Sequence, residues 1–365
     1  MFSRRHFLTT SLAGTAVLCA ASAEAAPVLS PTKWDATYDI VIAGAGGAGL
    51  AAACEAVDQK LSAVVYEKMA FMGGSSALCG GMIAAADTPE QKANGMKDSA
   101  EIFVKDLMVS GGGYADEKVV RAYVKEILEH YLWLTKTMGL KPDAVVQQGG
   151  QSVPRSHHFD PGKVLMTMAD YAKKHGVKVK TKVKVERLVW SSDMKRIEGV
   201  RIEAGGEQKY IRARKGVLIA TGGFAANPTM LAKYNPPLKE AAAISGKGTT
   251  GDGILMGLQA GSDMVDTAYI KASYGFKPQP VSIDEMTQVY WSGGIVVNQA
   301  ARRFVDESIS YKKMGDYALA QPEGKSYIVF DQAILERDYK NNPQGRVLWK
   351  PMLTGSKNET ANPQR

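Results

Sequence analysis

The sequence predicts an α/β fold, because strand-like and helix-like segments alternate in its N-terminal third and a block of further strands follows. Tyr38–Ala43 and Ser62–Glu67 are short, nearly continuous apolar runs, which are typical of parallel strands buried on both faces. Between them, Gly47–Gln59 is rich in alanine and predicts a helix. Together these segments predict a βαβ unit. The length of 365 residues allows a second domain, since domains commonly span about 100 to 200 residues.

Two more helices and a group of strands are expected after this unit. Ser99–Ser110 and Asp116–Thr137 have helical spacing, and the second is opened by acidic residues and closed at Gly139. Three segments with a period near two, separated by the turn signals SSDMK and AGGE, predict a three-stranded meander. These segments are Val177–Trp190, Arg196–Glu203 and Gln208–Ala213, and Val217–Ala220 is expected to form another buried strand.

Composition and charge exclude several classes of protein. With 45% hydrophobic and 22% charged residues, the chain resembles neither a disordered protein nor a polytopic membrane protein. The net charge of +8 comes from scattered basic residues without interleaved aromatic ones, so we expect no nucleic-acid partner. Of the three cysteines, Cys19 lies in a segment expected to be removed. Cys54 and Cys79 are too few for a disulfide framework.

Residues 1–25 predict a twin-arginine signal peptide. Arg4 and Arg5 precede a weakly apolar stretch, and small residues surround Glu24 where a signal peptidase would cleave. The apolar stretch is too short and too polar to cross about 30 Å of hydrocarbon, so no stable membrane anchor is expected. The twin-arginine route exports folded proteins, which often carry a cofactor. We therefore expect a periplasmic or other extracytoplasmic location.

A glycine motif joins the first expected strand to its helix. Gly44 permits a tight turn, Gly46 lets the backbone approach a pyrophosphate, and Gly49 lets helix and strand pack closely. Glu67 ends the second strand, about 20 residues after the motif, where a carboxylate accepts hydrogen bonds from ribose hydroxyls. This combination predicts a Rossmann-like dinucleotide-binding unit.

The glycine-rich segments that follow favour FAD over NAD as the cofactor. Gly73–Ser76 and Gly80–Met82 supply backbone N–H groups and hydroxyls just after Glu67, and a flavin with its ribityl chain needs such contacts beyond the pyrophosphate. Ala220–Gly223 and Thr250–Gly253 offer further backbone amides and one carboxylate to the same ligand. FAD is therefore the predicted cofactor.

Six segments resemble, in order and spacing, the flavoprotein of fumarate reductases, flavocytochromes c, urocanate reductases and ketosteroid dehydrogenases. The resemblance covers roughly residues 36 to 330. The segments are YDIVIAGAGGAGLAAA, VVYEKMAFMGGSSALCGGMIAAA, SVPRSHHF, GVLIATGGFAAN, TTGDGILMGLQAG and IVVNQAARRFVDE.

The resemblance implies a Rossmann-like FAD-binding domain over residues 36–268 and an inserted α+β capping domain over residues 269–365. We expect the capping domain to be incomplete, because the family continues with the rest of the cap and a last glycine-rich segment. No metal site is expected. The cofactor-binding residues expected are Gly44, Gly46, Ala48, Gly49, Glu67, Lys68, Gly74, Ser75, Ser76, Gly80, Gly81, Thr221, Gly222 and Asp252.

The sequence departs from the fumarate-reducing members where those carry charged substrate-binding and catalytic residues. The matching positions hold Ser273, Met286 with Thr287, Tyr290, and Tyr311. Fumarate is therefore not the expected substrate. The hydroxyls suggest a proton relay with Tyr311 as donor, and Lys312 is the candidate if the register differs by one residue. Alternatively, Tyr290 and Tyr311 only fill a less polar pocket.

Three other features of the sequence bear on its chemistry. His157 and His158 are adjacent and have no suitably spaced third ligand, so we expect a loop near the active site and no metal. Cys54 is expected in the core. Cys79, in the flavin loop, is expected to have no special role, and the alternative is a position near the flavin ring. No CxxCH motif occurs, so electrons are expected from a separate carrier, such as a cytochrome c or a quinol-linked protein.

Three functional hypotheses follow. The first is an exported FAD enzyme that reduces an activated carbon–carbon double bond, of the enoate or enone type, in a small unsaturated substrate. The second is a flavin dehydrogenase of the ketosteroid type, which runs the same chemistry in reverse. The third is a truncated, non-catalytic remnant.

Overall fold

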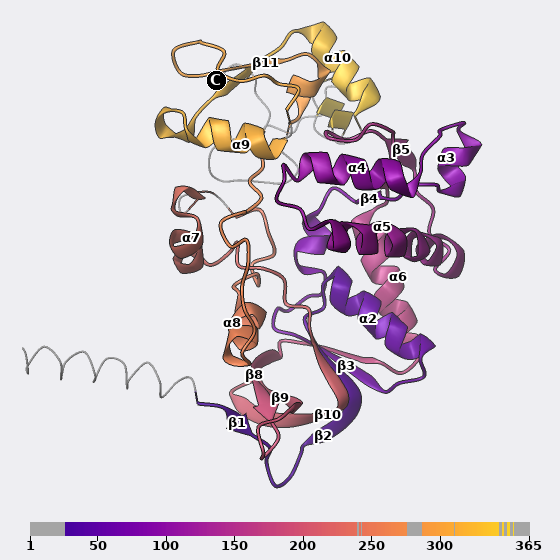
Figure 1. Cartoon of the computed structure of the whole chain (residues 1–365), viewed down its shortest axis with the longest axis vertical. Coiled ribbons are helices and arrows are strands. Elements are labelled where there is room, and N and C mark those ends of the chain that lie inside the picture. The colour runs from indigo at the N-terminus through magenta and orange to yellow at the C-terminus, as the bar shows by residue number, and fades with distance from the viewer. Residues whose placement is uncertain are drawn as a thin grey trace, which may run out of the picture. The chain divides into compact units, whose positions relative to one another are not determined.

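The computed structural model describes residues 26–238, 241, 243–275, 287–309, 311–342, 345–346, 349–350 and 353 (Figure 1). The predicted signal peptide, residues 1–25, lies outside the described residues. The chain forms two compact units, and it passes between them several times. The predicted domain boundaries at residues 36–268 and 269–365 stay a prediction. The first unit contains the described residues up to Gly74, Met168–Phe224 and Lys247–Val265, and the second contains Ser75–Thr167, Ala225–Gly246 and those from Asp266 onward.

The first unit is built on a seven-stranded mixed sheet with the order β1-β8-β9-β10-β2-β3-β7. Strands β10, β2, β3 and β7 run parallel, and β8, β9 and β10 form an antiparallel meander. The predicted α/β fold with a Rossmann-like βαβ unit is confirmed. The strands are β1 (Val28–Leu29), β2 (Ala36–Ala43), β3 (Ala63–Glu67), β7 (Lys178–Thr181), β8 (Lys184–Trp190), β9 (Ile197–Ala204) and β10 (Glu207–Ile219).

The prediction of one strand over Val177–Trp190 was wrong. The chain breaks at Lys182, whose φ of 57° is incompatible with an extended strand, so β7 and β8 are separate. β7 pairs with β3 in parallel, whereas β8 pairs with β9 in the meander. One apolar segment therefore serves two parts of the sheet.

The prediction of a separate buried strand at Val217–Ala220 was also wrong. Val217, Leu218 and Ile219 continue β10 beyond a bulge between Ala213 and Gly216, and they pair with β2. Leu218 is 39% exposed and Ile219 is 37% exposed, although successive side chains of a strand point to opposite faces. This end of β10 is therefore open on both faces within the first unit.

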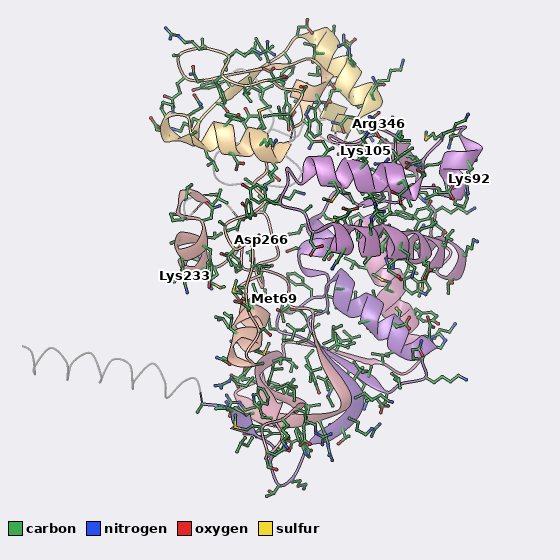
Figure 2. The ribbon with its side chains drawn as sticks, in the orientation of Figure 1. Met69, Lys92, Lys105, Lys233, Asp266 and Arg346 are labelled. Atoms are coloured by element: carbon green, nitrogen blue, oxygen red, sulfur yellow. The ribbon has the colours of Figure 1, made fainter. Side chains whose placement is uncertain are left out.

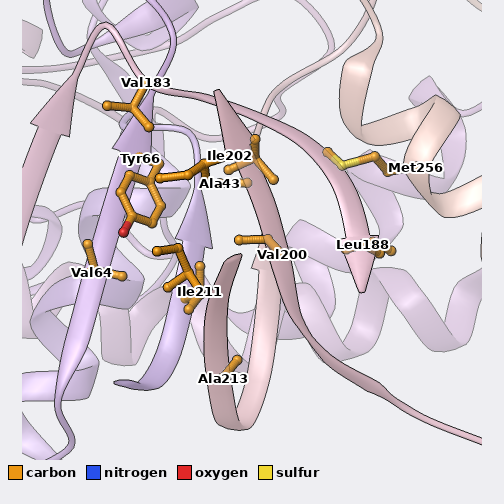
Figure 3. Packing of buried hydrophobic residues seen from close by; sticks show 12 residues of the cluster. Ala43, Val64, Tyr66, Val183, Leu188, Val200, Ile202, Ile211, Ala213 and Met256 are labelled. Atoms are coloured by element: carbon orange, nitrogen blue, oxygen red, sulfur yellow. The ribbon is translucent and has the colours of Figure 1, made fainter. Parts of the chain in front are cut away.

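The core of the first unit lies between the sheet strands and α8 (Asp252–Gln259), as Figure 3 shows. Tyr66, Val200, Ile202 and Met256 are among its buried side chains, and complete burial of one such side chain contributes about 1.5–3 kcal/mol. Helix α2 (Gly47–Asp58) packs against β2 and β3 and buries Cys54 completely. The core position predicted for Cys54 is thus confirmed, and burial raises the pKa of its thiol to about 12.

The second unit contains a three-stranded antiparallel sheet in the order β4-β6-β5. The two predicted helices are present, and a side chain caps the N-terminus of each. Ser99 accepts a hydrogen bond from the N–H of Ile102, and Asp116 accepts one from the N–H of Lys118. A π-helical turn at Trp133–Thr137 extends the second of them. The elements are β4 (Met82–Ala84), β5 (Ala144–Val146), β6 (Ser156–His158), α3 (Pro89–Ala93), α4 (Ala100–Ser110) and α5 (Glu117–Leu132).

The C-terminal part of the second unit has its own small core. Tyr274, Tyr290, Val296 and Met314 are buried together there. Helix α6 (Pro161–Lys174) links the two units along the chain, and no described helix is both long and apolar enough to cross a membrane. The remaining elements are α7 (Pro228–Tyr234), α9 (Tyr311–Leu319), α10 (Gln332–Asn341) and the antiparallel pair β11 (Ile295–Val297) and β12 (Tyr327–Val329), with short 3-10 turns at Gly74–Leu78, Pro236–Leu238, Val289–Ser292 and Pro322–Gly324.

Candidate functional site

The glycine motif forms a tight turn between β2 and α2. Gly44 has a φ of 105°, and a Cβ atom there would lie 2.4 Å from the carbonyl oxygen of Ala220. A Cβ atom at Gly49 would lie 1.9 Å from the carbonyl oxygen of Gly44. Real Cβ atoms do not make such contacts, so glycine is required at both positions for strand and helix to approach this closely. The tight turn predicted at Gly44 and the close packing predicted at Gly49 are both present.

The N-terminus of α2 is suited to an anionic group. Gly46 is its N-cap, no side chain caps it, and its first turn contains no acidic residue. The positive end of a helix dipole and its first N–H groups bind phosphates well. Ala48 is exposed in this first turn. The residues present therefore fit a pyrophosphate at this point.

Glu67 lies at the end of β3 and faces the glycine turn. Its side chain is buried, with 8% exposed, and one carboxylate oxygen accepts a hydrogen bond of 2.9 Å from the N–H of Ala45. The other oxygen accepts one of 2.8 Å from the N–H of Met69. Each carboxylate oxygen can accept a second hydrogen bond. Glu67 is therefore able to hold both backbone groups and also bind ribose hydroxyls.

The segment after Glu67 returns to the same turn. The N–H of Gly73 donates a hydrogen bond of 2.9 Å to the carbonyl of Ala45, and Gly46 and Gly73 form a parallel bridge. Gly74 has a φ of 50°, and the space around its missing Cβ is open. The sequence motifs at 44–49, 67 and 73–74 thus meet at the carboxyl ends of two parallel strands. Ligands of open α/β sheets bind at such edges.

Lys68, Thr250 and Asp252 form a polar cluster beside Glu67. The Lys68 ammonium donates to Asp252 at 2.9 Å and to the Thr250 hydroxyl at 2.6 Å. Thr250 in turn donates to the second carboxylate oxygen of Asp252 at 2.9 Å. Burial opposes ionisation of Asp252, but the hydrogen bonds from Lys68 and Thr250 outweigh it and lower its pKa. The Asp252 carboxylate is therefore held in its charged form.

The segment after β10 meets the start of α8. The N–H of Gly253 donates to the Thr221 hydroxyl at 3.1 Å, and the N–H of Gly251 donates to the carbonyl of Gly223 at 3.0 Å. Gly222 has a φ of 75°, and among the described residues a Cβ atom there would touch only Thr249. The structure thus brings the expected cofactor residues of the first unit, from four separate segments, to one edge of the sheet.

The other expected cofactor residues belong to the second unit. Ser75 and Ser76 lie in the 3-10 turn, and the Ser75 hydroxyl accepts a hydrogen bond of 3.0 Å from the N–H of Gly246. A Cβ atom at Gly81 would lie 1.9 Å from the carbonyl oxygen of Phe159, so this glycine serves close packing. Cys79 is exposed. The assignment of Ser75, Ser76, Gly80 and Gly81 to the cofactor stays a prediction.

The candidate catalytic residues lie in the C-terminal part of the second unit. Tyr290 is 2% exposed, and its ring packs edge-to-face against Tyr274 and Trp291, with centroids 5.5 Å and 5.3 Å away. This packing favours the alternative that Tyr290 fills space. Ser273 is exposed, and Lys312 is half-buried in α9. Tyr311 begins α9 and its side chain lies outside the described part, as does residue 286 entirely. Their catalytic roles stay predictions.

His157 and His158 lie in strand β6, so the loop expected for them was wrong. The strand forms because both residues pair with β4 and β5 on either side. His157 is completely buried, with its Nε2 2.8 Å from the Thr88 hydroxyl. Its neighbour His158 contacts Asp143 at 2.5 Å. Within the described residues, no group of three or more His, Cys, Asp or Glu side chains is placed to hold a metal ion.

Sequence reasoning missed a buried ion-pair network beside His157. The Arg155 guanidinium is completely buried and donates to Asp98 through two nitrogens, each at 2.9 Å, and to Asp106. Opposite charges from two segments balance this buried cation. The partners lie about 50 residues away along the chain, so no local pattern around Arg155 distinguished it from a surface arginine.

Comparison with known proteins gives matches over most of the chain. The family profile described as "FAD binding domain" matches residues 39–348. The NADH:fumarate oxidoreductase of Klebsiella pneumoniae (strain 342) is 31% identical over 326 residues, which is 88% of this chain and 34% of that protein. The acrylate reductase flavoprotein subunit of Shewanella woodyi is 33% identical over 287 residues, 74% of this chain and 56% of that protein. Against several fumarate reductases the chain spans about half of their length.

Solved structures give similar matches. The 3-ketosteroid-Δ4-(5α)-dehydrogenase of Rhodococcus jostii RHA1, in complex with 4-androstene-3,17-dione, has a TM-score of 0.73 and 28% identity over 85% of this chain and 70% of that chain. The open conformation of a flavocytochrome c3 fumarate reductase has a TM-score of 0.74 and 26% identity, covering 86% of this chain and 56% of that chain.

Proposed function

The chain belongs to the FAD binding domain family, with FAD as its cofactor, and on this premise we propose that it is an exported reductase of activated carbon–carbon double bonds. The observation that carries the proposal is the arrangement of the glycine turn at 44–49 and the buried Glu67 carboxylate at one edge of a parallel sheet. The expected substrate is a small enoate or enone. Fumarate is not expected.

The cofactor fits the residues of the first unit. The N-terminus of α2 would bind the pyrophosphate, and Glu67 would accept hydrogen bonds from the adenosine ribose. FAD, when bound and reduced, would supply the hydride for the substrate double bond, and an electron donor would reduce it again. The buried position of Glu67 excludes competing water from its carboxylate, which strengthens these hydrogen bonds.

The class of substrate is supported by the relatives. Besides acrylate reductase, they include a urocanate reductase of Eggerthella lenta and a vinyl phenol reductase of Lactiplantibacillus plantarum. Acrylate, urocanate and vinyl phenol each carry a carbon–carbon double bond. Ser273, Thr287 and Tyr290 stand where fumarate-reducing members are expected to carry charged groups, and this favours a less polar substrate. We assign proton donation to Tyr311, with Lys312 as the alternative.

The ketosteroid dehydrogenase match supports a second function, the reverse reaction that oxidises a saturated ketone. Both functions need an electron partner that the chain does not itself provide through a CxxCH haem site. We propose a cytochrome c or quinol-linked protein as that partner. Export through residues 1–25 would place the reaction outside the cytoplasm.

Activity measurements on the purified protein test the two directions. Oxidation of reduced viologen is followed with acrylate, a cinnamate, a cyclic enone and fumarate, and dye reduction is followed with saturated ketones. We expect a flavin spectrum, release of FAD and not FMN, and viologen oxidation with at least one non-dicarboxylate substrate. Dye reduction alone would establish the dehydrogenase, and a colourless protein that does not bind added FAD would refute both functions.

A further inference from the structure

We propose that Lys68 is a positioning residue for the cofactor: by binding Asp252 and Thr250, it fixes the backbone that carries Glu67 and so orients the carboxylate toward the adenosine ribose. The inference rests on the cofactor of the family and is independent of the proposed substrate. All the residues involved belong to the first unit.

Two neighbouring side chains hold the backbone at the end of β3. Glu67 and Lys68 are adjacent, and their side chains reach in different directions, Glu67 to Ala45 in the glycine turn and Lys68 to Asp252 in the loop before α8. The peptide between them is therefore held from two sides. If the Lys68 contact is lost, Glu67 keeps its hydrogen bonds to Ala45 and Met69 but loses the restraint on the residue that follows it.

The loop that Lys68 contacts is also joined to β10. Gly251 at its end has a φ of 85° and donates to Gly223, and Gly253 donates to Thr221, so the loop is joined to β10 through backbone donors. Lys68 joins the same loop to β3 through both Thr250 and Asp252. The loop therefore connects the ends of two strands that both border the cofactor site.

The aliphatic part of the Lys68 side chain packs against the same loop at Gly248. A Cβ atom at Gly248 would lie 3.1 Å from Cε of Lys68 and 3.0 Å from Cγ of Met69, which Figure 2 labels. Gly248 thus leaves room for the two side chains that follow Glu67 to lie against the loop. The Lys68 stem and the Met69 side chain are consequently held by shape as well as by charge.

Charge attraction between Lys68 and Asp252 also holds the loop. The side chains of Lys68 and Asp252 are 24% and 21% exposed, so water screens their attraction less than at the surface. Lys184 of β8 adds a weaker attraction to Asp252, and Thr250 donates a hydrogen bond to it. Without Lys68, burial of Asp252 would favour its protonated form, which cannot hold the loop in the same way.

The experiment compares FAD with ADP, which carries the adenosine ribose and the pyrophosphate but no flavin. Dissociation constants are measured by titration calorimetry on the apoprotein of the wild type, Lys68→Met, Lys68→Arg and Asp252→Asn. Lys178→Met is the control, because Lys178 is an exposed lysine of the neighbouring strand β7. Thermal unfolding of each apoprotein is measured in parallel.

We expect Lys68→Met and Asp252→Asn to weaken the binding of FAD and of ADP by the same factor, about tenfold, which corresponds to about 1.4 kcal/mol of binding free energy. Lys68→Arg is expected to restore most of the affinity, and Lys178→Met to leave it unchanged. Since Lys68 lowers the pKa of Asp252, FAD release on acidification should begin at a higher pH in Lys68→Met than in the wild type.

Several outcomes would overturn the inference. If Lys68→Met lowers the unfolding temperature but leaves both dissociation constants unchanged, Lys68 has only a stabilising role. If the binding of FAD is weakened and that of ADP is not, Lys68 acts on the flavin part of the cofactor and not on the adenosine ribose. Should Lys68→Met fail to fold, Asp252→Asn provides the same comparison. Wild-type protein that binds neither ligand would refute the cofactor assignment itself.

Discussion

The hydrogen-bond partners of His157 define its tautomer. Its Nδ1 lies 2.9 Å from the carbonyl of Arg155, so this nitrogen must carry a proton. Burial lowers the pKa of His157, which favours the neutral ring at neutral pH. In the neutral ring Nε2 accepts a hydrogen bond from the Thr88 hydroxyl, 2.8 Å away, while the hydroxyl oxygen accepts the N–H of Gln91.

Because the pKa of His157 is lower in the folded than in the unfolded protein, protonation favours the unfolded state. The contribution to stability is complete above the unfolded pKa of about 6.5 and is lost as pH falls toward the folded value. We expect the urea midpoint of the wild type to fall between pH 7.5 and pH 5. The fall should be smaller in His157→Gln, whose neutral amide can donate to Arg155 and accept from Thr88.

The exposed His175 of the first unit provides the matched control, and His175→Gln should retain the wild-type pH dependence. Burial also lowers the pKa of His130, so part of the fall is expected to persist in His157→Gln. Equal pH dependence in wild type and His157→Gln would contradict the assignment of a neutral, buried ring.

Tyr311 is the predicted proton donor, and removing its hydroxyl group tests this role. A phenol with a pKa near 10 is protonated at neutral pH, as a general acid must be. Tyr311→Phe retains the ring and removes only the hydroxyl, so turnover with the unsaturated substrate should fall about 100- to 10,000-fold while flavin reduction continues. Stopped-flow reduction and steady-state viologen oxidation separate the two steps.

Tyr317 serves as the control for Tyr311, because it lies on the same helix and is exposed. Tyr317→Phe should have no effect on turnover. If Tyr311→Phe retains near-normal turnover, the hydroxyl is not the proton donor, and Lys312 becomes the residue to replace.

The turn between β2 and α2 shows how closely two elements can depend on one missing side chain. A Cβ atom at Gly49 would overlap the carbonyl oxygen of Gly44, so Gly49→Ala must displace the helix from the strand. Overpacking of this kind costs about 1–3 kcal/mol. The displaced helix would also move its N-terminus from the pyrophosphate position, and we expect FAD to bind at least about tenfold more weakly.

Gly216→Ala in β10 is the control for Gly49→Ala. Apart from its chain neighbours, no atom of the described residues lies within 4 Å of the position of its Cβ, and its φ is not positive, so both stability and FAD affinity should remain near the wild-type values. Thermal unfolding and FAD titration measure the two effects. Unchanged stability and FAD affinity in Gly49→Ala would contradict the steric overlap between a Cβ atom at this position and the carbonyl oxygen of Gly44.

Features set by neighbours in the sequence could be predicted, and features set by distant partners could not. The glycine spacing and Glu67 predicted the βαβ unit because strand, turn and helix are consecutive. The break at Lys182 depends on β3, which pairs with β7 although more than 100 residues separate them. The same holds for Arg155, whose aspartates are distant in sequence, and for Lys68, whose role depends on Asp252.

Residues 26–29 are fixed to the first unit, and this would limit where the proposed signal peptide can be cleaved. The carbonyl of Ala26 accepts a hydrogen bond of 2.6 Å from Arg187, and β1 pairs Val28 with Val189 of β8. Cleavage before Ala26 leaves these interactions intact, whereas cleavage beyond Leu29 would remove an edge strand. We therefore expect the mature chain to begin at or near Ala26.

Replacing both Arg4 and Arg5 by Lys tests the export route, because twin-arginine recognition requires the arginine pair. We expect the precursor of this variant to remain in the cytoplasm, folded and loaded with FAD, while the wild type is recovered outside it. Cell fractionation, N-terminal sequencing and the flavin spectrum of each fraction provide the measurements. A chain starting at Ala26 should bind FAD equally well, since the glycine turn, Glu67 and Lys68 all lie beyond it. Normal export of the lysine variant would indicate the general secretory route, and FAD would then have to bind after export.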